Sequence, residues 1–111
     1  MAKYERTITG QFEDIIYQLQ NAIEANALTM NLVDESNYSS GDTKIAVRVY
    51  DKYFMRNSSR ASLSLTIAGH GNQIFISAIG AGGGQGVLFN FSWGAEEKMV
   101  DVVRKCIERM E

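Results

Sequence analysis

The chain has 111 residues, the size of one domain, and its 45% hydrophobic and 22% charged residues exclude a disordered polypeptide. Its 11 basic and 13 acidic side chains give a net charge of −2, which offers no electrostatic attraction for nucleic acid or an anionic membrane. The single cysteine, Cys106, excludes an intramolecular disulfide framework and fits a reducing compartment. Because residues 1–6 are too charged for a signal peptide and no run of about 18 apolar residues predicts a membrane span, we expect a cytoplasmic protein.

The first elements in chain order are a strand and a helix. Residues 3–9 are rich in β-formers and predict a short strand. A helix is predicted to begin after Gly10 and to end near Asn26, with the carboxylates of Glu13 and Asp14 in its first turn, where they complement the helix dipole. Its apolar stripe follows spacings of three and four residues: Phe12, Ile15, Ile16, Leu19, Ala22 and Ile23.

After this helix the apolar residues alternate, which is the period of half-buried strands. The alternation predicts strands at residues 28–32, 44–50, 61–67 and 74–78, and the polar stretch 34–42 predicts a turn or loop. On the strand 44–50 the apolar Ile45, Val47 and Val49 face one way, and the other face carries Lys44, Arg48 and Tyr50.

The last elements are a sixth strand and a second helix. The glycine-rich residues 80–86 interrupt the pattern, residues 87–92 alternate again, and a helix is predicted to begin near Trp93. The order β-α-β-β-β-β-β-α predicts a single α+β domain over residues 1–111, with an antiparallel sheet of five to six strands and two helices packed on one face.

Residues 61–95 contain no Asp, Glu, Lys or Arg. Either these strands occupy the middle of the sheet, or its second face is covered by a partner subunit or an apolar ligand, since an uncovered neutral strand pair is prone to aggregate. The exposure of four polar residues bears on the choice. If Ser62, Ser64, Thr66 and Gln73 face water, their small polar side chains are sufficient to keep the neutral strand pair from aggregating, and no partner is required.

Two groups of residues are candidates for binding. Glycines such as Gly82, Gly83 and Gly84 let a backbone approach an anion, but they fit neither a dinucleotide nor a phosphate-binding motif, which favours a bend or hairpin connection. Arg48 and Tyr50 suit anion or carboxylate recognition, although such pairs also decorate exposed sheet faces.

Catalysis and metal binding find little support in the sequence. His70 is the only histidine, so no histidine pair or triad can form, and its Gly-His-Gly-Asn context predicts a solvated turn. Cys106 lies on the apolar face of the last helix and is expected to be an inert core thiol. We therefore expect no catalytic residue, no metal, no cofactor and no enzymatic activity.

The segment 82–97, Gly-Gly-Gly-Gln-Gly-Val-Leu-Phe-Asn-Phe-Ser-Trp-Gly-Ala-Glu-Glu, resembles a family of small uncharacterised bacterial proteins, as does Val-Arg-Val-Tyr at 47–50. The resemblance implies a bacterial origin and a shared fold, and it transfers no catalytic residue. The element order is also similar to a shortened helix-grip (START/Bet v1-like) domain. The chain is short for that class and lacks a second helix after the first, so a plain two-layer arrangement is the other possibility.

Two functions follow from these features. The first is a non-enzymatic binding module that holds a small apolar or amphipathic molecule between the sheet and the last helix. Its predicted ligand-binding residues are Arg48, Tyr50, Gly82, Gly83, Gly84, Phe89, Phe91 and Trp93. The alternative is an interaction protein that forms a homodimer or larger homo-oligomer and binds no ligand. Neither nucleic acid nor a membrane is expected as a partner.

Overall fold

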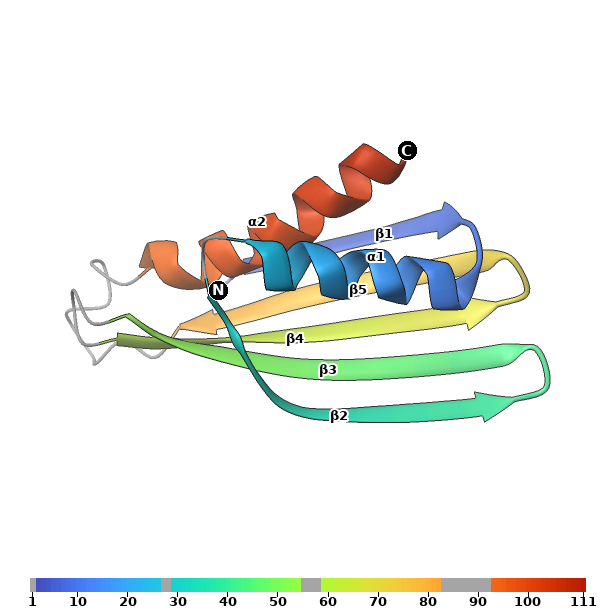
Figure 1. Cartoon of the computed structure of the whole chain (residues 1–111), viewed down its shortest axis with the longest axis horizontal. Helices are drawn as coiled ribbons and strands as arrows, with labels where there is room; N and C mark the ends of the chain where they lie inside the picture. The colour runs from blue at the N-terminus through green and yellow to red at the C-terminus, as the bar shows by residue number, and fades with distance from the viewer. Residues whose placement is uncertain (1, 27–28, 55–58, 83–92) are drawn as a thin grey trace.

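A computed structural model describes residues 2–26, 29–54, 59–82 and 93–111. It contains β1 (Ala2–Thr9), α1 (Phe12–Ala25), β2 (Asn31–Ser40), β3 (Thr43–Phe54), β4 (Ser59–His70), β5 (Gln73–Gly82) and α2 (Trp93–Met110). The strands form one antiparallel sheet in the order β1-β5-β4-β3-β2 (Figure 1). The predicted α+β class with five to six antiparallel strands is confirmed, and the strand predicted at 87–92 lies outside the described residues.

Both helices pack on the same face of the sheet. A Cβ atom at Gly69 of β4 would lie 2.8 Å from Phe12 in α1, and one at Gly80 of β5 would lie 3.0 Å from Val100 in α2. Gly69 pairs with Ile74, which shares its face of β5 with Gly80, so the two glycines mark one side of the sheet. The result is a two-layer arrangement, and the helix-grip resemblance is not confirmed (Figure 1).

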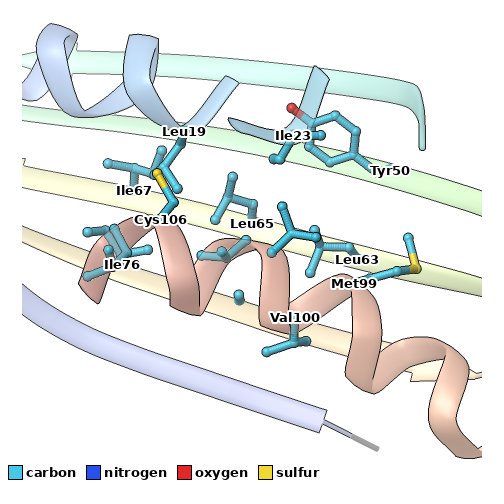
Figure 2. Packing of buried hydrophobic residues seen from close by; sticks show 14 of the residues in the cluster. Leu19, Ile23, Tyr50, Leu63, Leu65, Ile67, Ile76, Met99, Val100 and Cys106 are labelled. Carbon is cyan, nitrogen blue, oxygen red and sulfur yellow. The ribbon is translucent and has the colours of Figure 1, made fainter. Parts of the chain in front are cut away.

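The core lies between this face and the helices. The alternation of β4 turns Leu63, Leu65 and Ile67 toward the helices, where none of them is more than 1% exposed. They meet the apolar stripes of the two helices, which include Leu19 of α1 and Met99 of α2 (Figure 2). Burial of these stripes is the principal reason that the two helices lie where they do.

The prediction of a turn or loop at residues 34–42 is wrong for most of that segment. Strand β2 continues through Ser40, and only residues 41 and 42 form the turn to β3. All ten residues of β2 are exposed, and the strand pairs with β3 alone, at the edge of the sheet. Polar side chains at such a position stay in water while the backbone gains hydrogen bonds, so pairing overrides the low β-propensity of the segment.

Two-residue loops close the hairpins β2–β3 and β4–β5. Gly41 and Gly71 have φ angles of 56° and 61°, a region that side chains with a Cβ rarely adopt. The predicted tight turn around His70 is therefore confirmed. No helix among the described residues is long and apolar enough to cross a membrane.

Candidate functional site

The strand register divides the sheet into two faces. The covered face carries Leu63, Leu65 and Ile67 of β4 beneath the helices, and the open face carries Ser62, Ser64, Thr66 and Ala68 on the other side. In β3, Tyr50 pairs with Leu63 and Arg48 pairs with Leu65, so both predicted ligand-binding residues lie on the covered face. They are 5% and 6% exposed, so neither decorates an exposed sheet face.

Arg48 is bound by groups of the chain itself. Its Nη1 atom donates hydrogen bonds to the Val47 carbonyl and to Asn37 Oδ1, both at 3.0 Å, and a longer one of 3.5 Å to the Ser36 carbonyl. Its Nε atom lies 3.0 Å from Glu35 Oε1, close enough for an ion pair although the angle is not that of a hydrogen bond. These contacts tie β2 to β3, and they compete with any anion that Arg48 was predicted to recognise.

Tyr50 has the environment of a packing residue. Its ring lies beside Ile23 of α1 (Figure 2). Burial raises the pKa of its phenol above the usual 10.0; Arg48 opposes this shift, while Glu24 and Glu35 add to it. The phenol is therefore protonated at neutral pH, and the side chain can offer one O–H donor but no negative charge.

The glycines at the end of β5 allow α2 to approach the sheet. A Cβ atom at Gly82 would lie 2.5 Å from Glu96 Oε1, and one at Gly80 would lie 2.8 Å from the Glu96 carbonyl oxygen. The first turn of α2 therefore rests directly on β5, with Trp93 as the first residue of the helix. Among the predicted ligand-binding residues, Gly83, Gly84, Phe89 and Phe91 lie outside the described residues.

The structure does not bring Gly82 and Arg48 into one site. Gly82 pairs with Ala61 and Arg48 with Leu65, so they are separated by four residues along β4 and lie on the strands either side of it. Four residues of a strand span about 13 Å. The side chains of Met99, Val103 and Ile107, all 0% exposed, fill the layer between α2 and the sheet, where the ligand was predicted.

Glu96, in the first turn of α2, is a buried carboxylate that is not among the predicted ligand-binding residues. It is 5% exposed and packs over Gly80 and Gly82 at the start of α2. Two glycines at alternate positions of a strand, followed by a glutamate in the first turn of the next helix, are the signal that could have located it. A helix end can approach a strand closely where the strand carries glycine.

His70 and Cys106 are placed as predicted. His70 is exposed in the β4–β5 turn region, with Nδ1 3.1 Å from Thr43 Oγ1. Cys106 is buried, its Sγ lies 3.7 Å from the Gln18 carbonyl oxygen, and burial raises the pKa of its thiol (Figure 2). A raised pKa leaves little thiolate at neutral pH, which suits an unreactive core residue.

The open face is where the structure departs most from a simple reading of the alternation. In β3 the apolar Ile45, Val47 and Val49 pair with Ala68, Thr66 and Ser64, so they lie on the open face, away from the helices. On β5 the same face carries Phe75 and Ile79, which are 39% and 38% exposed. Neither helix covers this face (Figure 1).

Charged residues on the open face lie at its margins. Lys3 and Glu5 are on the edge strand β1, Asp34 is on the edge strand β2, and Asp51 lies near the strand ends, where its Oδ2 atom is 3.5 Å from Arg60 Nη1. Between these margins, the described part of β5 and residues 61–70 of β4 contain no charged side chain. Among the described residues, the open face is therefore uncharged in its centre and charged at its rim.

Comparison with known proteins identifies a family. The model of a protein family, described as a family of unknown function (DUF6054), matches residues 1–111. No curated protein and no solved structure matched the chain.

Proposed function

The chain belongs to DUF6054, a family of unknown function, and we propose that it acts as an interaction protein that forms a homodimer through the open face of its sheet. The observation that carries the proposal is the orientation of β3. This strand turns its three β-branched apolar residues, Ile45, Val47 and Val49, toward the face of the sheet that neither helix covers.

The apolar residues of the open face form two parallel strips. One strip is the β3 triplet, and the other is Phe75 and Ile79 on β5; the small side chains of β4 lie between them. Of the four residues named for a partner-free surface, Ser64 and Gln73 are exposed and Ser62 and Thr66 are half-buried. They do not account for the exposed Phe75 and Ile79 on the same face. Two apolar strips side by side on a sheet face that neither helix covers favour an interface.

The size of the open face suits a homodimer. Five strands at a spacing of about 4.8 Å, each spanning eight residues at about 3.3 Å, outline a face of roughly 600 Å². Two such faces bury roughly 1,200 Å² in total, which is the lower end of the range for stable protein interfaces. A small molecule prefers a concave pocket that surrounds most of its surface, and a strand-lined face does not provide one.

The experiment is a measurement of mass in solution by sedimentation equilibrium over micromolar concentrations. We expect the wild-type chain to dimerise and the double variant Phe75→Thr/Ile79→Thr to have a dissociation constant higher by more than about tenfold. Threonine keeps the β-propensity of the strand, so far-ultraviolet circular dichroism should be unchanged.

Tyr17→Ser provides the matched control, because Tyr17 is an exposed aromatic residue of α1, 65% exposed and away from the sheet. It should dimerise like the wild type. A wild-type chain that stays monomeric and soluble at about 100 μM overturns the proposal, as does a dimer that the double variant leaves unchanged.

A further inference from the structure

We infer that the second copy binds with a two-fold axis that runs along β4, so that β5 of one copy faces β3 of its partner and β1 faces the partner's β2. This inference rests on the proposed function and specifies the geometry of the dimer. Its starting point is the strand order, which places β4 in the centre of the sheet with two strands on each side.

The packing of sheets limits the choices of axis. Two sheets that pack face to face keep their strands aligned to within about 30°. A two-fold axis within the interface that runs along the strands satisfies this rule, and it exchanges the two edges of the sheet. Because the interface is isologous, every contact away from the axis occurs twice.

The strand register then pairs the apolar strips with each other. Phe75 and Ile45 both pair with Ala68, so they lie at the same level on either side of β4. Rotation about β4 therefore brings Phe75 onto the partner's Ile45. In the same way Ile79 and Val49 both pair with Ser64, and Ile79 meets the partner's Val49.

The residues on the axis are small. Ser64, Thr66 and Ala68 of β4 each approach their own copy across the axis. Small side chains there leave room for the larger ones on β3 and β5 to interdigitate, which is how the inner faces of a β-sandwich pack. Because the central strands are neutral, no like charges meet at the axis.

Charge complementarity at the rim selects this axis. Lys3 pairs with Ile79, and Asp34 pairs with Val49, so the register places both residues at one level on opposite edges of the sheet. Rotation about β4 brings the Lys3 ammonium to the partner's Asp34. The Lys3 side chain is 61% exposed and its Nζ is 3.9 Å from Glu5 Oε1, so its charge remains accessible. An axis across the strands would place β1 on the partner's β1 and leave the two charges on opposite edges.

A charge-reversal cycle tests this geometry. We expect Lys3→Glu and Asp34→Lys each to raise the dissociation constant of the dimer roughly tenfold at low salt, because each places like charges together twice. The double variant Lys3→Glu/Asp34→Lys should recover most of the wild-type affinity, because opposite charges meet again. Lys105→Glu, on the exposed side of α2, is the control and should leave the affinity unchanged.

A spin label supplies an independent readout of the axis. With the axis along β4, a label on Thr7→Cys in the edge strand β1 lies on the opposite edge from its copy, about 22 Å away when four strand spacings are combined with a sheet-to-sheet distance of about 10 Å. A label on Ser64→Cys lies next to its copy. We therefore expect strong dipolar broadening at position 64 and weak broadening at position 7, with the buried Cys106 left unlabelled.

The outcomes separate this inference from the proposed function. A dimer that the Phe75/Ile79 double variant disrupts, but that shows no rescue in the charge cycle or shows strong broadening at position 7, overturns the axis and leaves the proposed interface standing. A wild-type chain that is monomeric overturns both. Rescue together with broadening at position 64 supports both.

Discussion

Arg48 shows at the scale of one residue how a buried charge is accommodated. Its guanidinium uses separate nitrogens for the carbonyl and amide oxygens and for Glu35, as a planar fork allows. Arg48→Lys replaces the guanidinium by one ammonium, which cannot reach both the carbonyl and amide oxygens and the Glu35 carboxylate. We expect the free energy of unfolding to fall by about 1–2 kcal/mol, measured by urea denaturation at one protein concentration.

The matched control for Arg48→Lys is Arg60→Lys. Arg60 is an exposed residue whose Nη1 atom is 3.5 Å from Asp51 Oδ2, and an exposed pair of this kind contributes little to stability. Its substitution should change the free energy of unfolding by less than about 0.5 kcal/mol. Equal effects of the two substitutions would show that the buried fork has no special role.

Gly80 illustrates a second residue-scale constraint, the close approach of a helix to a strand. A Cβ atom there would lie 2.8 Å from a backbone oxygen of Glu96, which cannot move away without shifting α2. Gly80→Ala should therefore destabilise the protein by about 1–3 kcal/mol. Gly94→Ala is the control, because a Cβ atom at this helical position meets nothing within 4 Å, and it should be neutral or stabilising by up to about 1 kcal/mol. Thermal unfolding of the two variants distinguishes these cases.

At the scale of elements, the contact between α1 and β3 depends on pH. Lys44 Nζ lies 2.6 Å from Glu13 Oε2, and this hydrogen bond is the main cause that lowers the pKa of Glu13 below its usual 4.5. Because the folded pKa is lowered, the contact contributes its full stability above the unfolded pKa. The contribution is lost as the pH falls through the lower, folded pKa. Lys44→Met should return the Glu13 pKa toward 4.5, as followed by NMR of the side-chain carboxyl, whereas Lys105→Met should leave it unchanged.

Strand β2 shows where prediction from the sequence fails for an element. Nothing in the polar residues 34–40 favours a strand. They form one because they pair with β3, and this pairing extends from the turn to residues far from it in the sequence. By contrast β4 alternates so regularly that Leu63, Leu65 and Ile67 could be assigned to one buried face from the sequence alone.

The same alternation could not establish which face of β3 is covered. It separates Ile45, Val47 and Val49 from Arg48 and Tyr50, but the side on which the helices pack depends on the register with β4. Hydrophobicity alone would place the apolar set in the core. The candidate interface could therefore be anticipated from the uncharged residues 61–95, and its residues on β3 could be assigned only from the structure.

At the scale of the whole molecule, association through the open face should couple stability to concentration. A folded dimer that unfolds to two chains gains about 1.4 kcal/mol per mole of dimer for each tenfold rise in protein concentration. For a chain of 111 residues this corresponds to a rise in Tm of about 2–4 °C per tenfold. Phe75→Thr/Ile79→Thr should remove the dependence at concentrations below its raised dissociation constant, because those side chains belong to the interface and contribute little to the core of one chain. Scanning calorimetry over a hundredfold range of concentration measures the slope. A wild-type Tm that is independent of concentration would mean that the folded unit is the single chain and that its open face meets water.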